Sequence, residues 1–197
     1  MPSALPTLPK FQTAIVAQGP GKLAIQNNAP VPVLEPDMAI VKTAAVAINP
    51  ADAKMLDYSA APGAIHGYDF AGTVVALGSD ALKTGHLAVG DRVAGLVHGM
   101  NKLRPDVGAF AEYVGAYADI LLKIPDHMSF AEAASFGTGV ATASLCLFSE
   151  LAVPASLDQL GEHQSSGAVK AKDNREFVLV AGGSTATGTR ALQLLKL

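Results

Sequence analysis

Short apolar runs separated by turn-forming residues fill the chain from Phe11 to about Leu122, and they constrain its fold more than any other feature. Gly, Pro, Asn and Asp end the runs, as in Gly78-Ser79-Asp80 and Gly90-Asp91. Many short strands punctuated in this way are typical of all-β sheets and barrels. The sequence therefore predicts a small β-barrel, whose strand candidates are FQTAIVA, MAIVKTAAVAI, FAGTVVALG, DRVAGLV and AFAEYV.

The hydrophobic period changes at Ser129. Ser129 followed by Glu132 forms a capping box, and the apolar residues after it predict one long helix that ends near Leu151. Gly137 and Gly139 interrupt this helix, and each costs up to about 1 kcal/mol relative to Ala. We expect a break or a close approach there, either from tight packing or because a ligand nears the backbone at Thr138 and Thr142.

The last part of the chain predicts the beginning of a second domain. Residues 152–176 are polar and predict a surface loop at a domain boundary, whereas residues 1–10 are interpreted as a flexible arm. Phe177 to Ala181 predicts a buried strand, followed by a turn of small residues and an amphipathic helix over about residues 186–197. Because a parallel sheet needs several such units, the second domain is interpreted as unfinished, and its helix is expected to expose leucines.

Composition excludes several classes of partner. The net charge is -3 without a clustered Lys/Arg run, so neither nucleic acid nor a membrane surface is an expected partner. The single cysteine, Cys146, forms no internal disulfide, which favours a reducing, cytoplasmic location. We expect Cys146 to be a buried and inert residue of the apolar helix.

The turn after FVLVA has features of a phosphate-binding loop. Gly182 and Gly183 allow a close backbone approach, the following helix begins with free N–H groups, and Ser184, Thr185 and Thr187 add hydroxyl groups. The alternative is that these small residues are needed only for steric reasons.

Four motifs occur in order along the predicted barrel: AINPAD at 47–52, GYDFAGTV at 67–74, VGDRV at 89–93 and GAFAEY at 108–113. Together they resemble the medium-chain dehydrogenase/reductase superfamily. INPADAKM, GYDFAGTV and GGSTATGT are similar to the trans-acting enoyl reductases that serve fungal polyketide synthases. The resemblance implies an α/β fold class: a GroES-like barrel over residues 11–151 and a truncated Rossmann domain, of which residues 177–197 are the first β-α unit.

The resemblance also allows a test for zinc. Dehydrogenases of this superfamily that use zinc have a Cys and a His where this chain has Asn49 and Tyr68. Catalytic zinc needs about three protein ligands, and the five histidines show no ligand spacing. We expect no metal.

Without zinc, the resemblance implies conjugate reduction by NADPH of an α,β-unsaturated thioester. Stabilisation of developing negative charge is commonly the largest catalytic contribution, so Lys54 is the catalytic candidate; the alternative is a surface lysine. Tyr58 and Tyr68 are secondary proton-donor candidates that we expect to pack in the barrel. Asp52 is expected to orient the INPAD turn.

The remaining assignments also come from the resemblance. It places the cofactor at Ala51, Asp52, Ala53, Lys54, Ser184, Thr185, Ala186 and Thr187, and the substrate at Thr142, Ala143, Ser144, Leu145 and Cys146. It implies a monomer that acts in trans on a polyketide synthase or its carrier protein. Two alternatives stay open: a truncated, non-catalytic barrel that only docks or binds, and a zinc-free quinone or alkenal reductase.

Overall fold

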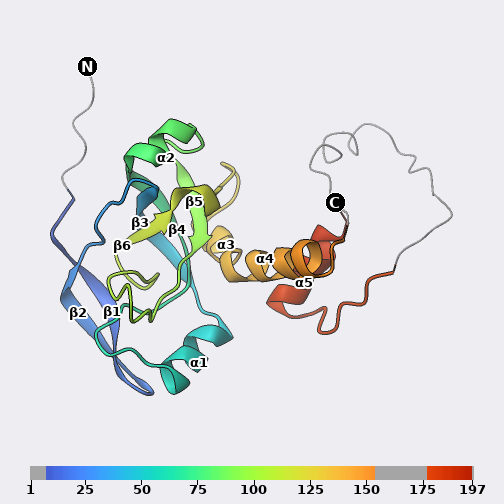
Figure 1. Ribbon diagram of the computed structural model, residues 1–197, viewed down its shortest axis with the longest axis horizontal. Helices are drawn as coiled ribbons and strands as arrows, with labels where there is room; N and C mark the ends of the chain where they lie inside the picture. Colours follow the sequence, from blue (N-terminus) through green and yellow to red (C-terminus); the bar gives the residue numbers. More distant parts are fainter. Residues whose placement is uncertain (1–7, 154–176, 197) are drawn as a thin grey trace. The chain divides into compact units, whose positions relative to one another are not determined.

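The computed structural model describes residues 8–153 and 177–196 (Figure 1). The chain divides into two compact units, one up to Thr138 and the other from Gly139 onward. The predicted arm over residues 1–10 and the predicted loop over residues 152–176 lie largely outside the described residues. The predicted domain boundaries therefore stay a prediction.

The first unit is built on two antiparallel sheets. β1 (Phe11–Gly19) and β2 (Lys22–Pro30) form a hairpin, and a five-stranded sheet has the order β6-β3-β4-β5-β7 (Figure 1). Its strands are β3 (Met38–Ala47), β4 (Asp69–Leu77), β5 (Arg92–Leu96), β6 (Tyr113–Tyr117) and the short β7 (Leu122–Lys123). Four of the five predicted strands are confirmed as β1, β3, β4 and β5. The fifth forms only from Tyr113 onward.

Backbone hydrogen bonds join the hairpin to the rest of the unit. The Ile15 N–H donates to the Phe110 carbonyl at 2.8 Å, and the Ile15 carbonyl accepts from His66 N–H at 2.9 Å. A core of apolar side chains, which includes Val41, Phe70 and Val114, lies against the larger sheet. Burial of such side chains contributes roughly 1.5–3 kcal/mol each, and it is the main stabilising contribution to this unit.

β2, α1 (Pro50–Tyr58) and α2 (Ser79–Thr84) are among the elements of the first unit that the sequence did not predict. β2 is polar and largely exposed, so it lacks the alternation by which the other strands were found. α1 and α2 occupy segments interpreted as turns. α1 carried a signal all the same, because Asn49 is an N-cap residue and Pro50 follows at the first helical position.

The helix predicted over residues 129–151 is not continuous, and the break expected near Gly137 is confirmed. The capping box of Ser129 and Glu132 is confirmed, but α3 (Phe130–Ala134) ends, α4 (Gly137–Ser144) begins anew, and a π-helix follows at Leu145–Glu150. The break has a cause in the first unit: the Asp69 carboxylate accepts the Thr138 N–H at 2.8 Å. An uninterrupted helix would use that N–H for its own ladder.

In the second unit, α5 (Ala186–Leu194) forms as predicted, but the strand predicted at residues 177–181 does not. Phe177 is 91% and Leu179 is 94% exposed, because no strand in the described part of the chain pairs with this segment. Leu194 and Leu195 are less exposed than expected, since they pack with Ala143, Leu147 and Ala191. Among the described residues, no helix has the length and apolar character to cross a bilayer.

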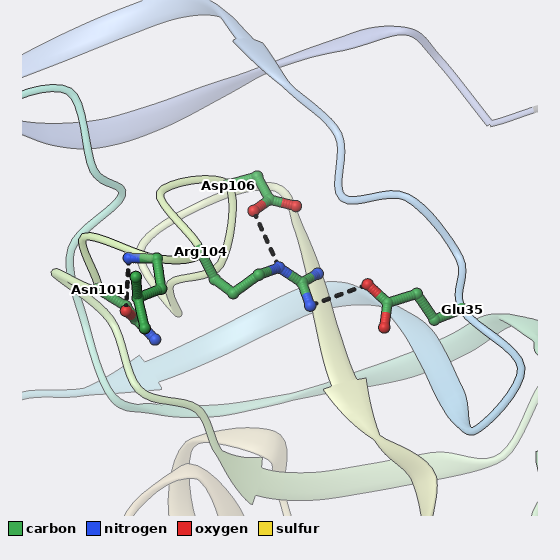
Figure 2. A network of polar contacts seen from close by, with 5 residues as sticks. Glu35, Asn101, Arg104 and Asp106 are labelled. Atoms are coloured by element: carbon green, nitrogen blue, oxygen red, sulfur yellow. Dashed lines mark hydrogen bonds and ion pairs between the residues drawn. The ribbon is translucent and has the colours of Figure 1, made fainter.

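A salt-bridge network holds the loop between β5 and β6 (Figure 2). The Arg104 guanidinium lies 2.9 Å from a carboxylate oxygen of Glu35 and 3.4 Å from one of Asp106. Asn101 accepts the Leu103 N–H at 2.9 Å within the same loop. Arg104 thereby ties this loop to the segment that precedes β3.

Gly67 generates a prediction about stability. Its φ is +96°, and a Cβ built there would lie 2.3 Å from the Phe110 ring, whereas Gly90 has a φ of +97° and nothing within 4 Å. Both Gly67→Ala and Gly90→Ala lose roughly 1–2 kcal/mol from the left-handed backbone. We expect Gly67→Ala to lose at least about 1 kcal/mol more because Phe110 must move, as measured by urea denaturation. Equal losses for the two variants would contradict this packing.

Candidate active site

The candidate site lies at one end of the larger sheet, where β3 ends, β4 begins and β5 ends. Ala47 pairs with Asp69, and Asp69 pairs with Leu96. This register places the INPAD segment beside the GYDF segment, although about 20 residues separate them in the sequence. Val97 N–H donates to the Tyr68 carbonyl at 2.9 Å, so the residues after β5 join the same end.

Asp52 holds the first turn of α1. It is 2% exposed, and its Oδ2 accepts the backbone N–H of Asn49 at 2.6 Å. The expected orienting role of Asp52 is therefore confirmed. Ala51 is half-buried beside it, whereas Ala53 and Lys54 are exposed. The assignment of these four residues to the cofactor stays a prediction.

Burial shifts three titratable groups near Asp52. Burial raises the pKa of Asp52, against the Asn49 N–H and the charge of His66, which lower it. Burial lowers the pKa of His66, and the negative charge of Asp52 partly restores it. The pKa of Tyr68 rises through burial first and the charge of Asp52 second. The site therefore disfavours added charge on each of these groups.

Asp69 has a role that the sequence analysis missed. It is 1% exposed, and its Oδ1 accepts both the Thr138 N–H at 2.8 Å and the Thr138 hydroxyl at 2.6 Å. A Cβ at Gly137 would lie 2.6 Å from the same oxygen. Of the two explanations for Gly137, the structure supports tight packing. The available signal was an acidic residue in a buried strand, which requires a partner.

Tyr58 and Tyr68, the secondary proton-donor candidates, differ in burial. Tyr68 is half-buried, and its ring centroid lies 5.8 Å from that of His98 at an interplanar angle of 41°. Tyr58 is 87% exposed, so the expectation that it packs in the barrel is wrong. It stands at the last position of α1, where its side chain leaves the core.

The turn before α5 belongs to the second unit, and Thr185 stabilises it. Thr185 is the N-cap: its Oγ1 accepts the Gly188 N–H at 3.0 Å and donates to the Gly182 carbonyl at 2.8 Å. The Thr185 hydroxyl hydrogen is thus used inside the turn, whereas Ser184 is exposed and Thr187 is half-buried. A Cβ at Gly188 would lie 2.2 Å from the Gly182 carbonyl oxygen, so this third glycine of the small-residue turn allows the turn to close.

The predicted substrate residues lie at the end of α4 and the start of the π-helix. Ala143 is 1% exposed and packs with Leu147 and Ala191, whereas Thr142 and Leu145 are exposed and Ser144 is half-buried. Cys146 is exposed, so the expectation of a buried cysteine is wrong. The π-helical turn changes which residues face α5, and a sequence pattern based on 3.6 residues per turn does not show this. The substrate assignment stays a prediction.

A metal site needs several ligands in one place. In the part of the chain that the structure describes, no three His, Cys, Asp or Glu side chains are grouped in a way that could hold a metal ion. Asn49 and Tyr68 stand where the resemblance places zinc ligands in other members. The absence of a metal remains an expectation.

His66 predicts how stability depends on pH. Its pKa in the folded state is below the ordinary 6.5, so as pH falls through 6.5 the unfolded chain binds a proton before the folded chain does. The free energy of unfolding should therefore fall below pH 6.5, by at most roughly 1.4 kcal/mol per pH unit from this group. His66→Gln should remove this part of the slope in denaturation curves at pH 5 to 7, and His127→Gln, at an exposed position, should not. Parallel slopes for His66→Gln and the unchanged chain would contradict the assignment.

Thr185 predicts the stability of α5. Thr185→Ala removes the N-cap and should destabilise the helix by roughly 1 kcal/mol, which hydrogen exchange of the α5 amides would detect. Thr185→Ser keeps the hydroxyl and serves as the control. Exchange that is unchanged in Thr185→Ala would show that the cap is not formed.

Comparison with known proteins adds to this geometry. Residues 35–126 match the model of the alcohol dehydrogenase GroES-like domain. The chain is 68% identical over 197 residues to trans-enoyl reductase caaB of Aspergillus niger and 64% identical over 189 residues to trans-enoyl reductase thnE of Trichoderma harzianum. The matches cover 100% and 96% of this chain but 52% and 50% of those proteins, so the chain spans about half the length of the curated relatives it matches.

Solved structures share the fold. The mycobacterial protein Rv1454c, solved in complex with NADPH, is 30% identical with a TM-score of 0.56, over 74% of this chain and 42% of that one. These similarities confirm the predicted α/β fold class and the predicted resemblance. Residues 35–126 are therefore a GroES-like domain of the alcohol dehydrogenase type, and the whole chain is similar to reductases of the medium-chain dehydrogenase/reductase superfamily.

Proposed function

We propose that this chain is part of an NADPH-dependent trans-enoyl reductase that reduces an α,β-unsaturated polyketide thioester in the cytoplasm. The observation that carries the proposal is the 68% identity, along the whole chain, with a trans-enoyl reductase. The partner would be a polyketide synthase or its carrier protein, and the chain would act on it as a monomer.

When bound, NADPH would supply the hydride for reduction at the β-carbon of the unsaturated thioester. The protein's part would be to stabilise the negative charge that develops on the thioester oxygen and to allow a proton to reach the α-carbon. A cation held near that oxygen lowers the barrier, commonly by several kcal/mol. Lys54 is the proposed catalytic residue, because it is exposed on α1, directly after the INPAD turn that Asp52 holds.

Two segments would hold the cofactor. On α1 these are Ala51, Asp52, Ala53 and Lys54. In the second unit, Gly182, with φ +74°, and Gly183 precede the N-terminus of α5 and carry no side chains, and Ser184 beside them is exposed. Free N–H groups at a helix N-terminus favour a phosphate, so Ser184, Thr185, Ala186 and Thr187 fit this role. Within this set, Thr185 shapes the turn rather than donating its hydroxyl hydrogen.

The substrate would lie along Thr142, Ala143, Ser144, Leu145 and Cys146. Thr142, Leu145 and Cys146 have exposed side chains that could contact an acyl chain directly. Ala143 would act through the packing of α4 on α5.

Titration with NADPH, followed by cofactor fluorescence, tests the proposal. The unchanged chain should bind saturably at micromolar concentration and should reduce an α,β-unsaturated acyl N-acetylcysteamine thioester. Lys54→Ala should lower turnover by roughly 100-fold or more, because the developing negative charge loses its cation, and Lys54→Arg should keep part of the rate. Lys83→Ala, on the exposed helix α2, is the matched control and should keep the full rate.

Two results would point elsewhere. A folded chain that binds no NADPH would favour a barrel that only docks or binds. Binding followed by reduction of a benzoquinone but not of the thioester would favour a quinone reductase.

A further inference from the structure

Two buried side chains, one in the first turn of α1 and one just before β4, each have an atom without a hydrogen-bond partner. Asp52 and His66 are each 2% exposed. Oδ1 of Asp52 and Nδ1 of His66 are buried and have no hydrogen-bond partner. A buried carboxylate oxygen and a buried imidazole nitrogen are both costly to leave unpaired, because each has lost its hydrogen bonds to water. The two groups could satisfy one another, since one accepts and the other can donate.

The backbone of His66 is held in place by two hydrogen bonds. Its backbone N–H donates to the Ile15 carbonyl at 2.9 Å, and its backbone carbonyl accepts the Phe110 N–H at 2.9 Å. The Phe110 ring meets the imidazole edge to face, with centroids 5.3 Å apart. The backbone and one side of the ring are thus held, and rotation about the side-chain bonds is the freedom that remains.

Asp52 is fixed from the other side. Its Oδ2 is bound to the Asn49 N–H, which leaves Oδ1 as the free acceptor. Met55 and Leu56 of α1 pack in one cluster with Ala64, two residues before His66. The helix that carries Asp52 therefore lies against the segment that carries His66.

We propose that His66 and Asp52 form a positioning pair, in which neutral His66 donates its Nδ1 proton to Oδ1 of Asp52, directly or through one water molecule, and so fixes the first turn of α1 and Lys54. The role assigned to Lys54 rests on the proposed function. The pair itself does not.

The surrounding charges support this proton arrangement. Asp69 is the other carboxylate near Asp52, and it raises the pKa of Asp52, whereas the backbone N–H of Tyr68 lowers it. The Tyr68 hydroxyl is neutral at pH 7, because its pKa is raised above 10. Oδ1 of Asp69 already accepts two hydrogen bonds from Thr138. An ionised Asp52 and a neutral His66 leave a single negative charge, and it lies at the positive end of the α1 dipole.

The tautomer of His66 is the most direct test, and long-range 15N–1H NMR of the labelled chain measures it. The unchanged chain should carry the proton on Nδ1. In Asp52→Asn the amide keeps an oxygen for the Asn49 N–H and turns its NH₂ toward the imidazole, so Nδ1 must accept and the proton should move to Nε2. Asp57→Asn, at an exposed position on the same helix, should leave the tautomer unchanged.

The pH profile and cofactor binding complete the test. Asp52→Asn should lower the pH midpoint of His66 further, because the attraction of the carboxylate for the imidazolium is lost. Asp52→Asn should also weaken NADPH binding about 3- to 10-fold and speed hydrogen exchange of the Lys54 backbone amide. Asp57→Asn should change neither NADPH binding nor this exchange rate. A proton on Nε2 in the unchanged chain, or a tautomer and midpoint that Asp52→Asn does not alter, would overturn the pair. If NADPH fails to bind but the tautomer changes as expected, the proposed function fails and the pair remains.

Discussion

The pairing of β3 with β4 is the constraint on which the rest of the first unit depends. The strands come so close that a Cβ at Gly72 would lie 2.1 Å from the Lys42 carbonyl oxygen. Their register sets Ala47 opposite Asp69, and a shift of one residue would exchange the buried and exposed faces. Because the INPAD segment continues β3 and the GYDF segment begins β4, this one register brings the two motifs together. The candidate site follows from strand pairing more than from local structure.

Buried polar groups are concentrated at this end of the sheet. Three of them are at most 2% exposed: Asp52, His66 and Asp69. The Asp69 side chain connects two segments that are distant in the sequence, and Asp52 and His66 each have a buried atom without a partner. Oδ1 of Asp69 accepts twice from Thr138, in the first turn of α4. Asp52 is satisfied at one oxygen only. Buried charge tends to be retained where it orients other groups, and here it underlies the helix that carries Lys54.

The motifs could be found in the sequence because each depends on residues close together in the chain. Ser129 and Glu132 predicted a capping box, and alternating apolar residues predicted β1, β3, β4 and β5, because these patterns reflect local backbone geometry. α1 was missed although Asn49, Pro50 and Asp52 are a recognisable helix start, since the same residues also favour a turn. The strand predicted at residues 177–181 failed for the opposite reason: its apolar pattern was correct, but a strand needs a neighbour to pair with.

The sequence by itself determined the resemblance to the superfamily, the order of the four motifs and the candidate site residues, because these depend on residue types at short spacing. Only the tertiary structure decided which side chains are buried together. Neither the bond from Asp69 to Thr138 nor the partnerless atoms of Asp52 and His66 could be read from spacing. The exposure of Tyr58 and Cys146 was decided in the same way. Burial and hydrogen-bond partners arise from contacts between distant segments, and strand register and helix breaks set those contacts.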